Sequence, residues 1–297
     1  MSTDAVLREL LSRQLDAWLP AALHRSRRAT LVVAGADADT PEAAVRAVAA
    51  AGGLRGRRLT VLVLADQADD LPTRLGAAEA TLPAEATVHL VPGDHTRLPV
   101  ALKAAGAAGA PVLAVLDAHR ATPAADVLAS VAAGRPGELL LTARTPVRDT
   151  LAARFPLVAE VEWVPSDATE PRIVAFATGS DRGLDAFKTA LWTVARSTGA
   201  LLRDPADPHA DPVTTTVDPD PAPLAEALTA ELTRSGPRTV TELRRHALTA
   251  TVYRSADVLP ALTGLLDAGT VRRDPPDGRL GGDVLITLDP AGATPTA

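Results

Sequence analysis

The sequence predicts an α/β protein with a doubly wound, mostly parallel sheet, followed by a smaller C-terminal domain. Short apolar runs alternate with alanine-rich helical stretches over most of the first half of the 297 residues. Such alternation is typical of parallel sheets with right-handed crossovers. A later pair of strand-like runs is joined by a short polar segment. Six prolines lie between residues 203 and 223, so this stretch is not expected to form a regular helix or strand.

The first predicted element is an amphipathic helix over residues 4–23. Its apolar side chains recur at spacings of three and four, and they are Val6, Leu7, Leu10, Leu11, Leu15, Trp18 and Leu19. One face of this helix is therefore expected to pack against another part of the protein.

Five apolar runs with the length of strands buried on both faces come next. They cover residues 30–34, 59–64, 87–91, 112–116 and 138–142. The stretches between them are rich in alanine and have high helix propensity, and they cover residues 41–51, 69–80, 97–108 and 121–133.

Two further runs, residues 160–164 and 172–178, are too close in sequence for a parallel crossover. We therefore expect them to form an antiparallel hairpin. A helix over residues 180–195 has one apolar face, made by Leu184, Phe187, Leu191, Trp192 and Val194. It is expected to close the first domain.

We place the first domain at residues 1–202, a linker at 203–223 and a second domain at 224–297. The second domain has helical pieces over residues 224–233, 239–247 and 255–268, and then two strands around a glycine- and proline-rich turn in 269–288. This order is typical of a winged helix–turn–helix.

Composition excludes several classes of function. The absence of cysteine rules out disulfides, thiolate nucleophiles and cysteine-ligated metals. A net charge of −6 gives no overall attraction for nucleic acid or anionic lipid. No run approaches the roughly 18 apolar residues of a membrane span, and the N-terminus lacks the pattern of a signal peptide. We expect a cytoplasmic protein with no membrane partner.

The predicted winged helix carries one local basic cluster, Arg244 and Arg245 with Arg254. These are the residues expected to contact nucleic acid, if any do. Residues 221–297 contain 8 arginines against 9 aspartates and glutamates, and affinity for duplex DNA depends largely on neutralising phosphates. A protein partner is therefore favoured over DNA.

Several local patterns resemble the three-Cys-motif partner (TcmP) family. They are Asp16-Ala-Trp-Leu19 in the first helix, Phe176-Ala-Thr178, Gly183-Leu184 and Ala190-Leu-Trp192. The resemblance implies a class I methyltransferase-like Rossmann domain, whose strand inventory is also five parallel strands and a hairpin. Members of the family carry Phe-Ala-Gly-Pro-Gly after the first strand and Asp-Pro-Phe/Tyr-Gly after the fourth. This chain has Ala34-Gly-Ala-Asp37 and Asp117-Ala-His-Arg120 there, so both turns depart from the pattern.

The candidate site lies at the strand ends, because doubly wound sheets bind ligands beyond the carboxyl ends of their strands. We expect Gly35, Asp37, Asp66, Gly93 and Asp94 to hold a nucleoside-like cofactor. Asp66 is placed to accept hydrogen bonds from ribose hydroxyls, or else it is a helix cap or a solvated loop residue. Gly93 and Asp94 are placed to contact an adenine amino group, or they form a plain turn. Gly35 allows close approach of the backbone to a ligand, or a positive φ.

The charges near Gly35 favour S-adenosylmethionine over a dinucleotide. Asp37 and Asp39 stand close to the start of the next helix, where a phosphate would need bare amides and the positive helix end. A dinucleotide loop also normally needs more than one glycine. S-adenosylmethionine carries a sulfonium cation and no phosphate, so acidic residues oppose it less.

Asp117 and His119 are the candidate catalytic residues. The carboxylate could accept hydrogen bonds from a target nitrogen of a small molecule or a nucleobase, or the two could form a general acid–base pair. A capping aspartate beside an exposed histidine is the alternative. A metal site that adds Asp94 and His95 lacks the spacing of a helical metal motif, and we predict no metal.

Two functions follow from these residues. The first is a divergent methyltransferase-like enzyme that uses S-adenosylmethionine on a substrate that the sequence does not identify. The second is a noncatalytic interaction or regulatory protein that uses the degenerate Rossmann domain and the winged helix.

Overall fold

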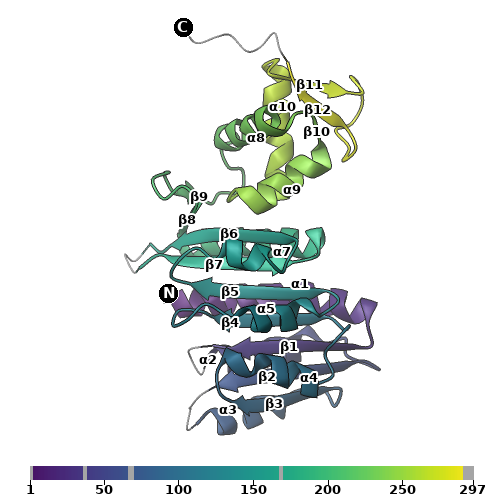
Figure 1. Ribbon diagram of the computed structural model, residues 1–297, viewed down its shortest axis with the longest axis vertical. Helices are drawn as coiled ribbons and strands as arrows, with labels where there is room; N and C mark the ends of the chain where they lie inside the picture. Colours follow the sequence, from purple (N-terminus) through teal and green to yellow (C-terminus); the bar gives the residue numbers. More distant parts are fainter. Residues whose placement is uncertain (1–2, 36–38, 66–69, 167–169, 290–297) are drawn as a thin grey trace. The chain divides into compact units, whose positions relative to one another are not determined.

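The computed structural model describes residues 3–35, 39–65, 70–166 and 170–289 (Figure 1). The chain divides into two compact units, Met1–Pro212 and Val213–Ala297. We describe each unit by itself.

The first unit is built on a mixed, mostly parallel sheet with the order β3-β2-β1-β4-β5-β7-β6-β8. Five strands are parallel: β1 (Arg28–Ala34), β2 (Arg58–Ala65), β3 (Ala86–Pro92), β4 (Val112–Asp117) and β5 (Gly137–Ala143). The remaining three run antiparallel to their neighbours: β6 (Leu157–Val164), β7 (Arg172–Thr178) and β8 (Leu201–Arg203). The predicted α/β class, the parallel strands and the hairpin are confirmed.

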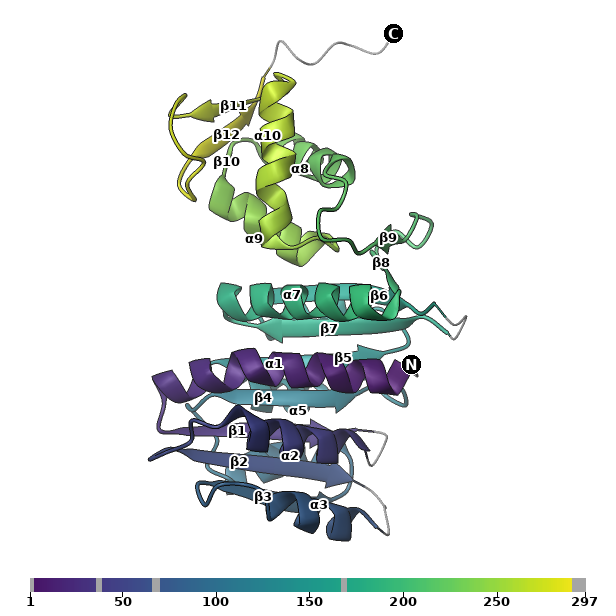
Figure 2. The ribbon, with the colours of Figure 1, turned by 180° about the vertical axis from the view of Figure 1, so that it is seen from behind.

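Helices cover both faces of this sheet. One face carries α1 (Thr3–Arg25), α2 (Asp39–Ala51), α3 (Leu71–Glu79) and α7 (Asp181–Thr198), as Figure 2 shows. The other carries α4 (Leu98–Ala104), α5 (Ala125–Ala132) and the short α6 (Arg148–Ala152) (Figure 1). This arrangement is the Rossmann-like one that the alternation predicts.

The core lies on both sides of the central strands. On one side Val32 and Leu139 pack in one cluster with Leu98, Leu128 and Leu151 from the three helices of that face. On the other side the apolar face of α1 is buried as predicted, with Val6, Leu10, Leu11, Leu15, Trp18 and Leu19 all at most 4% exposed.

The closing helix α7 also has the predicted buried face. The ring of Phe187 stacks on that of Phe176 from β7, with centroids 4.9 Å apart. Gly199, in the left-handed conformation at φ 70°, ends the helix, and its N–H donates to the carbonyl of Ala195. Glycine is favoured at such a cap because it has no Cβ.

Two expectations about the strands and helices are wrong. Residues 87–91 do form a strand, but β3 is the edge of the sheet and much of it is exposed, Leu90 to 39%. An apolar run has the same sequence pattern at an edge as at the centre. The helix predicted over residues 97–108 ends at Ala104, and Gly106 follows with φ 61°.

Within its described residues, the second unit contains three α-helices and a small antiparallel sheet in the order β10-β12-β11. In chain order its elements are β9 (Val213–Thr214), α8 (Ala222–Ser235), β10 (Arg238–Thr239), α9 (Val240–Ala250), the 3₁₀ turn η2 (Ser255–Asp257), α10 (Val258–Asp267), β11 (Val271–Asp274) and β12 (Leu285–Leu288). Leu224, Leu228, Leu243 and Leu262 are fully buried in its core. The three predicted helical pieces and the terminal pair of strands are present, whereas the range predicted to be a linker contains β9.

Thr239 shows why α9 begins where it does. Its hydroxyl accepts a hydrogen bond from the N–H of Glu242, and the Glu242 carboxylate accepts one from the N–H of Thr239. This reciprocal capping box satisfies two N–H groups that a helix start otherwise leaves free. None of the described helices combines the length and the apolar character that a membrane span requires.

Candidate functional site

A cavity of about 260 Å³ opens at the carboxyl ends of β1 and β4. The chain passes outward from β1 through β2 and β3 and then returns to the other side of β1 as β4. Ligands of open α/β sheets bind at such a reversal. Among the described residues, the polar side chains that line the cavity are those of Asp4, Thr40, Asp117, His119, Thr142 and Arg172.

Asp117 and His119 form a hydrogen-bonded pair inside this cavity. Asp117 Oδ1 lies 2.5 Å from His119 Nδ1 and accepts a further bond, at 3.0 Å, from the His119 N–H. The hydroxyl of Thr142, at the end of β5, lies 3.3 Å from the same oxygen. A carboxylate oxygen can only accept, so Nδ1 carries the hydrogen and a neutral imidazole keeps Nε2 as an acceptor.

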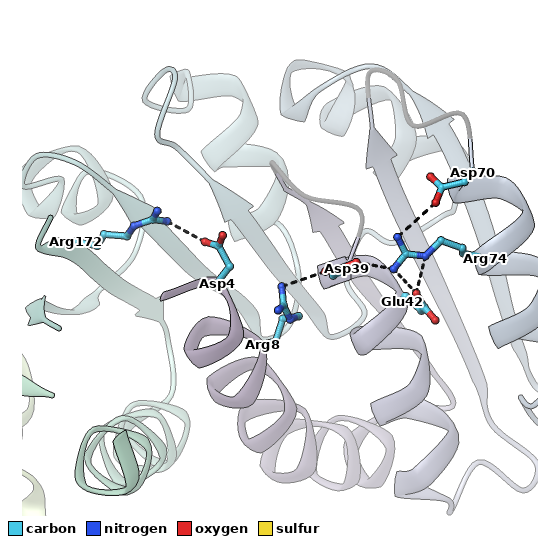
Figure 3. A network of polar contacts seen from close by, with 7 residues as sticks. All are labelled: Asp4, Arg8, Asp39, Glu42, Asp70, Arg74 and Arg172. Atoms are coloured by element: carbon cyan, nitrogen blue, oxygen red, sulfur yellow. Dashed lines mark hydrogen bonds and ion pairs between the residues drawn. The ribbon is translucent and has the colours of Figure 1, made fainter. Parts of the chain in front are cut away.

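An ion pair stands at the edge of the cavity. Arg172 Nη1 lies 3.3 Å from Asp4 Oδ1 (Figure 3), which joins the start of β7 to the first turn of α1. Arg172 reaches this edge because β7 runs antiparallel to β5, so β7 begins where β5 ends. Leu7 and Leu11 of α1 add an apolar wall.

A second set of charges fixes the start of α2 beside the cavity. Arg74 from α3 donates to Asp39 at 2.6 Å and to Glu42 at 2.8 Å, and Arg8 of α1 lies 3.9 Å from Asp39 (Figure 3). The hydrogen bond from Arg74 lowers the pKa of Asp39. This network ties three helices together around the end of β1.

Gly35 lines the cavity directly after β1. Its φ is not positive, so that part of the expectation is wrong. Apart from its chain neighbours, a Cβ at this position would meet no atom of the described residues within 4 Å. The backbone of Gly35 therefore borders open space that a ligand could occupy.

Gly93 and Asp94 have the structural role that the sequence left as the alternative. Gly93 turns the chain at φ 116°. Asp94 caps the 3₁₀ turn η1 (His95–Arg97), since its Oδ1 accepts bonds from the N–H and the hydroxyl of Thr96, at 2.9 and 2.5 Å. These bonds lower the pKa of Asp94. In the described part of the chain, neither residue lines the cavity.

Asp37 and Asp66 lie outside the described residues. Of the predicted strand-end residues, the structure therefore brings Gly35, Asp117 and His119 together. His95 does not line the cavity with them, and no group of three or more potential ligands is arranged around a metal site within the ranges described.

The three arginines predicted to contact nucleic acid differ in their surroundings. Arg254 lies close to Asp257, donating to its carboxylate oxygens at 2.6 and 3.0 Å. Arg244 and Arg245 both lie on α9, where the Arg244 side chain is partly buried and that of Arg245 is exposed. Only part of the basic cluster is thus presented to solvent.

Sequence reasoning missed Asp4, Thr142 and Arg172 as residues of this cavity. Thr142 ends the fifth predicted strand, so the strand-end argument could have found it. Asp4 and Arg172 are separated by 168 positions, and nothing in the sequence pattern pairs them. No protein-family model matches the chain, and comparison with curated proteins gives no significant match.

Proposed function

We propose that the chain is a divergent methyltransferase-like protein that binds S-adenosylmethionine at the carboxyl edge of its sheet. The observation that carries the proposal is the cavity where the strand order reverses, with Asp117 and His119 paired inside it. The strand inventory, five parallel strands and then an antiparallel hairpin, supports it, as does the resemblance of the hairpin and closing helix to the TcmP family.

The residues present fit such a cofactor in charge and space. Two carboxylates, of Asp4 and Asp117, line the cavity against one guanidinium, that of Arg172, which is paired with Asp4; this balance of charge opposes a phosphate. Gly35 leaves open space beside the backbone. The cavity of about 260 Å³ is smaller than the ~300–1,000 Å³ of ordinary small-molecule sites, so we assign to it the reactive end of the cofactor and the acceptor group.

The chain's own residues would position the acceptor and remove its proton. When bound, S-adenosylmethionine supplies an electrophilic methyl group on a cationic sulfur. Asp117 would hold the N–H of a small-molecule or nucleobase acceptor. His119, whose Nδ1 is held by Asp117, would receive the proton on Nε2 as the nitrogen gains the methyl group.

The second candidate function is noncatalytic binding of a protein partner through the C-terminal unit. The order α8-β10-α9-α10 followed by the hairpin β11–β12 supports a winged helix. Arg254 is held by Asp257, and the helix α10 after it contains no basic residue. We therefore favour a protein over DNA as its partner.

Thermal unfolding with added ligand tests the cofactor proposal. A ligand at roughly 100 times its Kd stabilises the native state by about 2.7 kcal/mol, so S-adenosylmethionine and S-adenosylhomocysteine should both raise the Tm. Asp66→Ala should abolish the shift, because a carboxylate after the second strand is the expected ribose contact. No shift with either ligand at millimolar concentration would overturn the proposal.

A second measurement separates binding from catalysis. Asp117→Asn keeps the shape of the side chain and should preserve the thermal shift, while lowering methyl transfer by about 10²–10⁴-fold. Thr40→Ser, at another polar position of the cavity, is the matched control for both readouts. Binding without transfer in the wild type would favour the noncatalytic function.

A further inference from the structure

A second, larger cavity lies at the opposite edge of the same sheet. It has a volume of about 460 Å³ and is lined by residues of α1, the start of β5 and the start of α7. Glu138 stands at the beginning of β5, whereas the Asp117–His119 cavity lies at the carboxyl end of the strands. The two cavities are therefore separate sites.

Two buried side chains of α1 reach this cavity without hydrogen-bond partners. Gln14 is 1% exposed, and in the described part of the chain neither its Oε1 nor its Nε2 has a partner. Trp18 is 4% exposed, and its Nε1 likewise has no hydrogen-bond partner among the described residues. The two residues are one helical turn apart and so share a face. Most buried polar groups have a partner, so these three atoms point to a missing ligand.

A buried carboxyl completes the polar lining. Glu138 is 3% exposed, and its Oε1 accepts a hydrogen bond from the hydroxyl of Thr178 at 2.9 Å. A Cβ at Gly183 would lie 2.5 Å from this oxygen, so a larger residue there would collide with the carboxyl group. Burial raises the pKa of Glu138, which favours the protonated form that can also donate.

A basic cavity of about 350 Å³ adjoins this one and shares Arg25 and Pro136 with it. Arg25, Arg135 and Arg154 line it, all exposed, and none of its described lining residues is acidic. The larger cavity is lined by Arg25 and Arg182 together with Asp16, Asp185 and Glu138, so acidic side chains stand beside its arginines. A phosphate group is therefore bound more favourably in the basic cavity, where no described carboxyl group opposes it.

We propose that the two adjoining cavities form one binding site for a nucleoside monophosphate. The planar base would occupy the larger cavity, where the Gln14 amide can pair with a ring edge that carries one donor and one acceptor, and the Trp18 indole can donate a further bond. The phosphate would occupy the basic cavity, because guanidinium groups bind phosphate oxygens in pairs. Since this site is remote from Asp117, the nucleotide would act as an effector or a second ligand.

Isothermal titration calorimetry on the full chain tests this with AMP, GMP, CMP and UMP, each beside its nucleoside, and with inorganic phosphate. At least one nucleotide should bind with a Kd below about 1 mM, and about tenfold or more tighter than its nucleoside or phosphate. Binding of none of the four overturns the proposal. Phosphate that binds as tightly as the nucleotide means an adventitious ion only, and it overturns the proposal too.

Variants locate the site. Arg135→Ala combined with Arg154→Ala should weaken nucleotide binding about tenfold or more and leave nucleoside binding unchanged. Arg55→Ala, another exposed arginine outside both cavities, is the matched control. If the double variant binds as the wild type does, the phosphate assignment is wrong.

Gln14→Leu tests the base pocket independently. It should weaken nucleotide binding about tenfold and at the same time raise the Tm of the free protein, because it removes an unpartnered amide. An unchanged affinity would contradict the proposal. Asp117→Asn should leave nucleotide affinity unchanged; its loss would place the nucleotide at the carboxyl edge and would overturn this site without affecting the proposed function.

Discussion

The two edges of the sheet carry cavities that differ in how their polar groups are satisfied. At the carboxyl edge, Asp117 is bonded to His119 and Thr142, and Asp4 is paired with Arg172. At the amino edge, Gln14 and Trp18 have buried polar atoms that find no partner in the described residues. A preformed pair needs no rearrangement when a ligand arrives. Unpartnered groups gain most when a ligand supplies the missing bonds.

The glycines at the two edges give the largest expected contrast. A Cβ at Gly137, the first residue of β5, would lie 2.2 Å from the carbonyl oxygen of Val131, whereas one at Gly35 would meet no described atom within 4 Å beyond its chain neighbours. Overpacking against backbone cannot be relieved by a rotamer change, so Gly137→Ala should destabilise the protein by about 3 kcal/mol. Gly35→Ala should change the free energy of unfolding by less than about 1 kcal/mol.

Urea unfolding measures both variants. Gly35→Ala should also reduce the thermal shift with S-adenosylmethionine, because the new methyl group projects into the space beside β1. If Gly137→Ala were as stable as the wild type, the backbone at the start of β5 would be able to shift and make room for the added methyl group. The amino-edge cavity would then be less rigid than its contacts indicate.

The next contrast tests whether polar groups at the two edges stabilise the fold or destabilise it. Gln14→Leu removes an amide that is buried without partners, so it should stabilise the protein by about 1 kcal/mol. Thr142→Val removes a hydroxyl that lies 3.3 Å from Asp117, so it should destabilise by about 1 kcal/mol. Chemical denaturation of both variants gives the two signs. If both substitutions changed the free energy of unfolding in the same direction, the difference proposed between the two edges would be wrong.

The sequence was sufficient for features that depend on local pattern. The bounds of β7, residues 172–178, were predicted as they are found, because the apolar run stands between Pro171 and Gly179. Asp117 and His119 were placed together because two positions on one turn after a strand are close in any fold. The buried face of α7 follows in the same way from the spacing of Leu184 and Leu191.

Features that depend on tertiary neighbours were out of reach. The edge position of β3 follows from the order of the strands, and its apolar residues do not reveal it. The functions expected of Gly93 and Asp94 depended on where the third strand lies relative to the cavity. Gln14 is a polar residue in an amphipathic helix, and only the packing of α1 beside α7 shows that its amide is buried.

The smallest expected contrast is the sign of the pH dependence of two carboxyl groups. Burial raises the pKa of Glu138 above its ordinary value of 4.5, so the folded state holds the proton more tightly than the unfolded state. The stability that Glu138 contributes is then fully present in acid and is lost as the pH rises through its raised pKa. Glu138→Gln does not titrate, so its stability relative to the wild type should increase from pH 4 to pH 8.

Asp94 at the other edge should behave in the opposite way. Its hydrogen bonds with Thr96 lower its pKa below 3.8, so its contribution is present at neutral pH and is lost as the pH falls through the lowered value. Asp94→Asn should therefore be slightly less stable than the wild type at pH 7, and this difference should shrink towards pH 3. Urea unfolding midpoints of both variants and of the wild type, measured across the pH range, give the pH dependence of each stability difference. If the stability difference between Glu138→Gln and the wild type did not change with pH, the Glu138 carboxyl group would be solvated. The proposed base pocket would then lose one of its buried polar groups.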